Sequence, residues 1–133
     1  MAGTVLDSYA LLAYFRDEPG AETVEKLLVK AAQGNKPLHM TEVNYAEVRY
    51  MTIRKDGKAA WDKAAELLKS LPIEFRAADR AVAECAADFK VKHRLSLADA
   101  FAAALAKLKK AQLVTGDPEF RALEKEIKIN WSK

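Results

Sequence analysis

The 133-residue sequence contains one cysteine, Cys85, and only five glycines and four prolines. A single cysteine excludes an intrachain disulfide and a cysteine-rich metal site, and it favours a reducing compartment. The longest wholly apolar run, residues 100–106, is far too short to cross a bilayer. No basic segment precedes an apolar run near the start, so no targeting signal is expected. These features predict a cytoplasmic protein without a membrane segment, folded as one domain over residues 1–133.

The chain also lacks a strong charge of either sign, because 22 basic residues are offset by 19 acidic ones for a net charge of +3. This balance by itself favours polyanions only weakly. The basic residues group near two predicted helix ends, at Arg49, Arg54, Lys55 and Lys58 and at Lys90, Lys92, His93 and Arg94. Cations are favourable at any helix C-terminus, so these groups alone do not establish nucleic-acid binding.

Half of the residues are hydrophobic, and their spacing predicts alternating strands and helices. The predicted strands are Thr4–Leu6, Pro37–Met40, Ile73–Phe75, Leu113–Thr115 and a final edge strand that includes Ile127 and Ile129. The predicted helices are Ser8–Phe15, Ala21–Gln33, a helix capped by Thr41 that runs to about Lys55, Lys58–Ser70, Ala77–Lys92, Leu97–Lys109 and Pro118–Glu124. Short apolar strands separated by helices indicate an α/β fold of three layers, with a parallel sheet covered on both faces.

Acidic residues recur where predicted strands end or predicted helices begin. Asp7 follows the strand Thr4–Leu6, and Asp117 follows the strand Leu113–Thr115. Asp99 opens a helix with no polar residue from 100 to 106, which indicates a buried helix. Glu47 lies on the helix after the second strand. In an open α/β sheet, ligands bind outside the carboxyl ends of the strands, so these carboxylates are expected to converge on one pocket.

Each carboxylate also has a purely structural interpretation. Asp7 and Asp117 can cap the helices that follow them, and Asp117 precedes a proline as such caps often do. Ser96 and Asp99 have the spacing of a capping box. Glu47 lies on a partly apolar helix face, where it could pair with Arg54 two turns along.

These separate structural interpretations do not explain why all four carboxylates are expected at the same end of the sheet. Two carboxylates about 4 Å apart repel by roughly 4 kcal/mol at an effective dielectric of 20. Converging carboxylates therefore shift their pKa values or bind a cation. Hard oxygen ligands, with no cysteine or histidine pair among them, indicate Mg²⁺ or Mn²⁺. Such a metal site is the usual apparatus for hydrolysing phosphodiesters.

Four segments that contain these acids resemble, in order, the motifs of PIN-domain proteins, and in particular the VapC-type toxin ribonucleases of toxin–antitoxin pairs. The segments are Val5-Leu6-Asp7-Ser8, Asn44-Tyr45-Ala46-Glu47-Val48, Leu95-Ser96-Leu97-Ala98-Asp99-Ala100 and Thr115-Gly116-Asp117-Pro118-Glu119-Phe120. The resemblance implies a five-stranded parallel sheet between two helical layers, and a homodimer as the common assembly. It also implies a Mg²⁺- or Mn²⁺-dependent endoribonuclease that acts on RNA and is held inactive by an antitoxin protein.

By position, the resemblance assigns metal binding and catalysis to Asp7, Glu47, Asp99 and Asp117. Ser8 and Thr115 match small hydroxyl positions beside the acids, and Asn44 lies one turn before Glu47 on the same helix face. These three are expected to support the carboxylates or a water. The positions that select the RNA are not part of these motifs, so the resemblance implies no target sequence.

Three other functions are compatible with parts of this pattern. A phosphatase with an aspartyl nucleophile would need a second aspartate where Tyr9 stands, and a phospho-receiver domain would need an adjacent acidic pair near Asp7. A non-catalytic RNA-binding or protein-interaction module with the same fold remains the main alternative. His39 and His93 form no nucleophilic triad with Cys85, and all three are expected to be structural or surface residues.

Overall fold

The computed structural model describes residues 3–133, in which the strands all run parallel in one five-stranded sheet. The sheet order is β3-β2-β1-β4-β5. The strands are β1 (Thr4–Leu6), β2 (Leu38–Thr41), β3 (Ile73–Arg76), β4 (Gln112–Thr115) and β5 (Ile129–Trp131). The helices are α1 (Ser8–Arg16), α2 (Ala21–Gly34), α3 (Glu42–Asp56), α4 (Lys58–Ser70), α5 (Arg80–Lys92), α6 (Leu97–Lys109) and the 3-10 helix η1 (Pro118–Leu123). The predicted parallel sheet and the edge position of β5 are confirmed.

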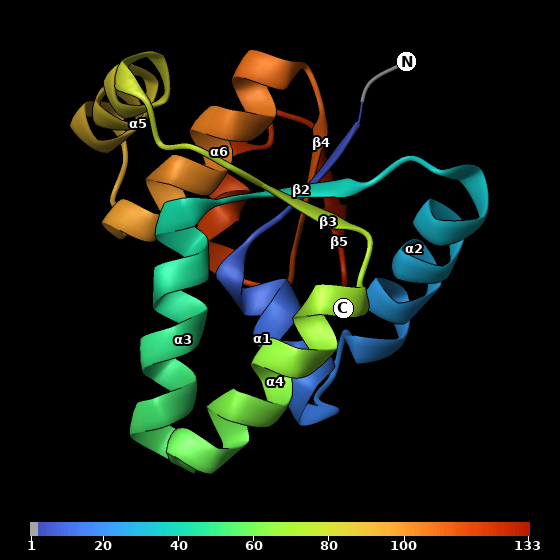
Figure 1. Cartoon of the computed structure of the whole chain (residues 1–133). Helices are drawn as coiled ribbons and strands as arrows, with labels where there is room; N and C mark the ends of the chain where they lie inside the picture. The colour runs from blue at the N-terminus through green and yellow to red at the C-terminus, as the bar shows by residue number, and fades with distance from the viewer. Residues whose placement is uncertain (1–2) are drawn as a thin grey trace.

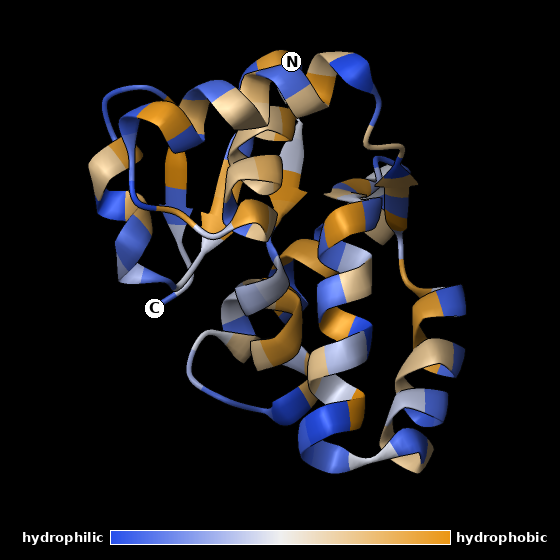
Figure 2. Cartoon of the chain, turned by 90° about the vertical axis from the view of Figure 1, so that its left-hand side faces the viewer, coloured by the Kyte–Doolittle hydropathy of each residue, from blue (hydrophilic) through white to orange (hydrophobic). Residues whose placement is uncertain are grey.

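Helices cover both faces of the sheet, with α5 and α6 above the strands and α1, α3 and α4 below them in Figure 1. Neighbouring residues of a strand point to opposite faces. Val5 of β1 accordingly packs in the core with α5 and α6, whereas Leu6 packs in the core with α1, α2, α3 and α4. The strands are mostly hydrophobic in Figure 2, and the turn between α3 and α4 is hydrophilic. This arrangement confirms the three-layer α/β class.

Two element starts differ from those predicted by two or more residues, and several other boundaries shift by one residue. The helix predicted from Ala77 begins at Arg80, because the Asp79 side chain accepts a hydrogen bond from Val82 N at 3.1 Å and caps it there. The final strand begins at Ile129, and Ile127 precedes it as a buried core residue. The segment after Asp117 is a 3-10 helix. In the part of the chain that the structure describes, no helix has both the length and the apolar character for a membrane crossing.

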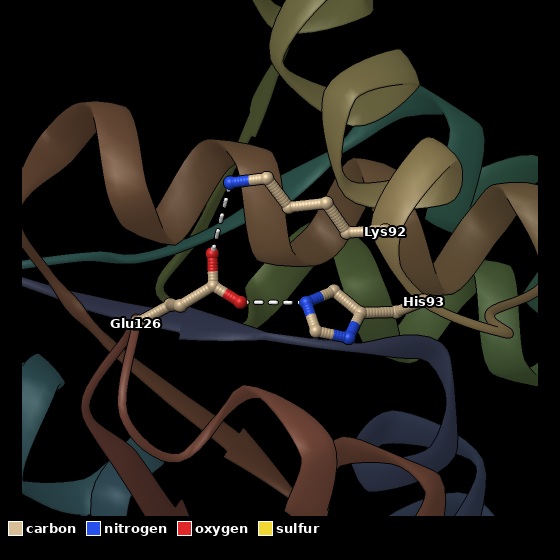
Figure 3. Close-up of polar contacts among 3 residues, drawn as sticks. All are labelled: Lys92, His93 and Glu126. Atoms are coloured by element: carbon tan, nitrogen blue, oxygen red, sulfur yellow. Dashed lines mark hydrogen bonds and ion pairs between the residues drawn. The ribbon is translucent and has the colours of Figure 1, made fainter.

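The connection between η1 and β5 is held against the end of α5. The His93 ring Nε2 lies 2.6 Å from Glu126 Oε2, and Lys92 Nζ lies 4.0 Å from Glu126 Oε1 (Figure 3). Ile127 is buried next to this contact in the core cluster that includes Phe89. These contacts fix the start of β5, and they give His93 the structural role expected for it.

Candidate active site

The register of β1 and β4 brings two chain segments together at the carboxyl edge of the sheet. Leu6 pairs with Val114, so Asp7 and Thr115 are the next residues of the two strands. The Asp7 N–H donates to Val114 O at 3.3 Å, and the Thr115 hydroxyl donates to Asp7 Oδ2. Thr115 Oγ1 in turn accepts a hydrogen bond from Asp117 N at 3.0 Å. Thr115 therefore connects the two strand-end aspartates by hydrogen bonds.

The Asp7 side chain is fully buried. Its Oδ1 accepts a hydrogen bond from Ala10 N at 2.8 Å, so Asp7 also caps α1. Burial raises the pKa of Asp7 from 3.8 to about 8, and the Asp99 and Asp117 carboxylates contribute to the rise, while the bonds from Thr115 and Ala10 oppose it. The metal-free protein therefore holds a proton on Asp7 at neutral pH.

Asp99 lies in the first turn of α6 and is 8% exposed. The Ser96 hydroxyl accepts a hydrogen bond from Asp99 N at 3.1 Å, so Ser96 caps the helix as its spacing predicted. Burial raises the pKa of Asp99 to about 7, and repulsion from Asp117 and Glu47 adds to the rise. Capping uses the backbone N–H of Asp99 as its donor. The Asp99 carboxylate takes no part in that cap, and it lies in a cluster with the carboxylates of Asp117 and Glu119.

A cavity of about 290 Å³ opens at this edge of the sheet, here named the acidic cavity. Its wall includes Glu47, Asp99, Asp117 and Glu119, and also Ser8 and Tyr9. One carboxylate oxygen from each of Asp99, Asp117 and Glu119 lies within 4.8 Å of the others. The structure thus brings three of the four predicted acids to one cavity. Asp7 is not part of the wall but is close enough to Asp99 and Asp117 for their charges to affect its pKa.

Glu119 was not among the residues predicted for the site. It lies two positions after Asp117, and its N–H donates to Asp117 Oδ1 at 3.0 Å. The segment after Asp117 was expected to be a simple capped helix. The structure forms the 3-10 helix η1 there, and the Glu119 carboxylate lies in the same cluster as that of Asp117. The signal in the sequence was its place in the fourth motif segment, two residues after Asp117.

The structural interpretation of Glu47 as a partner of Arg54 is wrong. Among residues 3–133, no ion pair of Glu47 is formed, and the Arg54 guanidinium lies over the Tyr50 ring at 5.3 Å from its centroid. Glu47 is half-buried and lies on the wall of the acidic cavity. Its charge acts on Asp99, whose pKa it raises.

Asn44 and Ser8 form a buried polar network at the acidic cavity, which Ser8 also lines. Asn44 Nδ2 donates to Ser8 Oγ at 2.9 Å and to Ala98 O at 3.2 Å. Asn44 Oδ1 accepts a hydrogen bond from the Thr41 hydroxyl. The network joins the first turns of α1, α3 and α6, the helices that carry the acids. Ser8 and Asn44 therefore hold these helices in place and make no side-chain hydrogen bond to the four carboxylates in the described structure.

Replacing Asn44 by alanine is expected to lower the free energy of unfolding by about 2–3 kcal/mol, because it leaves buried partners on three elements without hydrogen bonds. Ser8→Ala removes only the contact to Asn44 and is expected to cost about 1 kcal/mol. Urea unfolding followed by circular dichroism measures both. Equal losses would contradict a bridging role of the Asn44 amide to α6.

A larger cleft of about 540 Å³ lies between α1, α3 and α4, away from the carboxylate cluster. Its wall carries both charges, and Arg16 Nε lies 3.4 Å from Asp56 Oδ2 across it. Size favours this cleft over the acidic cavity, but its wall mixes basic and acidic side chains, and Arg16 and Asp56 pair with each other there. The acidic cavity is the better candidate because its charges are of one sign and unpaired.

Comparison with known proteins identifies the family and the fold. The PIN domain family matches residues 4–126. No curated protein matches the sequence. Among solved structures, the fold is similar to that of VapBC from Salmonella typhimurium bound to DNA (TM-score 0.76, 14% identity, 100% of both chains covered). It is also similar to VapBC2 from Rickettsia felis bound to a promoter DNA fragment (TM-score 0.73, 15% identity, 96% of this chain and 97% of that chain).

A third similar structure is that of VapC20 from Mycobacterium tuberculosis, described as a Sarcin-Ricin loop cleaving toxin (TM-score 0.65, 20% identity, 90% of this chain and 94% of that chain). At these identities the similarity establishes the fold, which is that of VapC-type toxins. The family match covers nearly all of the sequence and includes every acid of the site. The chain belongs to the PIN-domain family.

Proposed function

We propose that this protein is a metal-dependent endoribonuclease and the toxin of a toxin–antitoxin pair. The observation that carries the proposal is the group of Asp99, Asp117 and Glu119, whose oxygens lie within 4.8 Å of one another. Family membership and the similarity to VapC20 support the choice of RNA as substrate.

The donor set fits a hard divalent cation, because every ligand atom in the cluster is a carboxylate oxygen. We assign metal binding to Asp7, Glu47, Asp99 and Asp117, with Glu119 as an addition from the structure. When bound, Mg²⁺ or Mn²⁺ would supply a water of lowered pKa and neutralise the scissile phosphate. Asp7 must lose its proton for this role, because its pKa of about 8 keeps it neutral otherwise.

The remaining residues of the site position these carboxylates. Thr115 orients the Asp7 carboxyl group and binds the backbone N–H of Asp117, so it holds the two aspartates at a fixed separation. Asn44 and Ser8 fix the helices that carry Glu47 and Asp99. Glu47 and Glu119 lie on the wall of the cavity, where a carboxylate oxygen not bound to the metal would orient the attacking water.

An antitoxin protein is the proposed partner, and a homodimer is the proposed assembly of this single PIN-like domain. Several similar structures are of toxin–antitoxin complexes, including one from Klebsiella pneumoniae (TM-score 0.70, 16% identity, 98% of each chain). A cavity with several carboxylates would attract a basic group of such a partner. We place the protein in the cytoplasm, where a toxin of this kind would meet its RNA.

The test is cleavage of a mixed-sequence single-stranded RNA by purified protein that carries no partner. We expect cleavage with Mg²⁺ or Mn²⁺ and none with EDTA. Isothermal titration calorimetry measures metal binding in parallel. Absence of both cleavage and metal binding would contradict the proposal and favour the non-catalytic module.

A further inference from the structure

A third cavity, of about 590 Å³, lies next to the acidic cavity. We name it the Trp131 groove, after one of its lining residues. It is formed by η1 and the end of β5 and is lined by Gly116, Pro118, Arg121, Glu124, Trp131 and Lys133. Gly116 and Pro118 are the neighbours of Asp117 in the chain, so the groove and the acidic cavity lie on two sides of the same three residues.

The wall between the two cavities is thin. Tyr9 lines the acidic cavity, and Lys133 Nζ of the groove lies 4.8 Å from the centroid of the Tyr9 ring. A Cβ atom at Gly116 would lie 2.6 Å from Tyr9 Cε1 and 3.2 Å from Lys133 Cε. Because Gly116 has no side chain, Tyr9 and Lys133 can both pack against its backbone. A ligand in one cavity is therefore next to a ligand in the other.

The charges of the groove complement those of the acidic cavity. Arg121 and Lys133 are exposed, and neither forms an ion pair with a carboxylate in residues 3–133. Cationic side chains that contact the neighbouring phosphates of a nucleic acid strand release counterions and raise its affinity. Glu124, the acid of the groove, already accepts a hydrogen bond from Trp131 Nε1 at 3.1 Å.

Trp131 adds a surface for a base. Its side chain is half-buried, packs against the core beside α6 and lines the groove. Its polar edge is held by Glu124, which limits rotation of the ring. Aromatic rings beside cationic side chains are the usual platform for single-stranded nucleic acids, in which unpaired bases can stack.

We propose that the Trp131 groove binds the nucleotide next to the scissile phosphate of a single-stranded RNA, with its base on Trp131 and its phosphate between Arg121 and Lys133. This proposal rests on the proposed ribonuclease function. It makes Trp131 and Arg121 positioning residues, which act on the substrate and not on the reacting atoms. A base in a duplex is already stacked and paired, so the groove selects an unpaired nucleotide.

The test measures RNA binding in EDTA, where no cleavage is expected, by anisotropy of a labelled 12-nucleotide single-stranded RNA and by tryptophan emission. Trp61, the other tryptophan, is 2% exposed, so quenching by RNA reports on Trp131. We expect quenching by single-stranded RNA and none by duplex RNA. We expect Arg121→Gln to weaken binding about 10-fold. Lys128→Gln is the matched control, because it removes one charge from an exposed residue just before β5, at the end of that strand opposite Trp131.

Trp131 is tested by two replacements, since it also contacts the core. Trp131→Phe keeps a ring and should retain binding within about threefold, whereas Trp131→Leu should lose about 10-fold. Circular dichroism verifies folding. If Trp131→Leu does not fold, Arg121→Gln and the quenching of the unaltered protein decide the outcome. With Mg²⁺, the same variants should raise KM and leave kcat nearly unchanged.

The outcomes separate this proposal from the nuclease itself. RNA cleavage without tryptophan quenching would contradict the proposed nucleotide site but not the ribonuclease function. The same holds if Arg121→Gln and Lys128→Gln weaken RNA binding equally. If quenching depends on Arg121 but the protein cleaves no RNA, RNA binding in the Trp131 groove is supported and the ribonuclease function is contradicted. Equal quenching by a polyglutamate peptide would show a site for acidic protein segments and overturn the proposal.

Discussion

Replacement of Asp99 by asparagine is expected to lower RNA cleavage by about 1,000-fold or more, the scale on which a central electrostatic or proton-transfer group contributes. The carboxylate is 8% exposed and shares the cluster with Asp117 and Glu119. Asparagine keeps the shape of the side chain and the backbone N–H that Ser96 caps. It removes one negative charge, so metal affinity should fall together with the cleavage rate.

The measurement compares initial cleavage rates at saturating Mg²⁺ with metal affinities from calorimetry. Glu25→Gln is the matched control, because Glu25 is exposed on α2 outside the carboxylate cluster, and its rate should be unchanged. Glu119→Gln should show an intermediate loss, since Glu119 belongs to the cluster but is exposed. If the Asp99→Asn variant unfolds and the unaltered protein binds no metal, the metal site is contradicted and Asp99 has only a structural role in capping α6.

Without metal, the stability of the protein is expected to fall as the pH rises from about 5 to about 8. Asp7 and Asp99 have folded-state pKa values of about 8 and about 7, against an ordinary value of 3.8. Between those values the unfolded chain has released protons that the folded protein still holds. Raising the pH in this window therefore favours unfolding, and the effect ends once the pH exceeds the folded-state values.

The loss from Asp7 is expected to be on the order of 3 kcal/mol, because each pKa unit corresponds to about 1.4 kcal/mol. This equals a decrease in Tm of roughly 10 °C for a chain of this size. The carboxylates interact, so the titration belongs to the group and not to single residues. Thermal unfolding in EDTA at pH 5, 6.5 and 8 measures the slope.

Asp7→Asn should flatten this dependence, since its amide holds no titrating proton. Asparagine can still cap α1 through Ala10 N, the bond that Asp7 makes at 2.8 Å. The variant should therefore match the unaltered protein at pH 5 and exceed it in Tm at pH 8. Addition of Mg²⁺ at pH 8 should stabilise the unaltered protein and have little effect on the variant. Parallel pH profiles of the two proteins would show that Asp7 is not the buried group that titrates.

The sequence by itself determined the order of elements and the placement of the acids along the chain. The short run Thr4–Leu6 predicted a strand, and Val5 and Leu6 are fully buried in β1. In a parallel sheet, an acid directly after such a strand lies at the carboxyl edge. The all-apolar stretch after Asp99 likewise predicted a buried helix, and its alanines are nearly all inaccessible. These predictions succeed because each depends on residues close together in the chain.

The contacts between elements were decided by the tertiary structure. The strand order places Thr115 against Asp7, and the docking of three helices joins Asn44 to Ser8 and Ala98. The 3-10 turn of η1 brings Glu119 to the acidic cavity, and burial leaves Asp7 beside it with a raised pKa. Periodicity specifies which face of an element is buried but not which side chains from other elements meet it, because that depends on strand order and helix packing. The sequence therefore located the acids, and the fold determined which of them share one cavity.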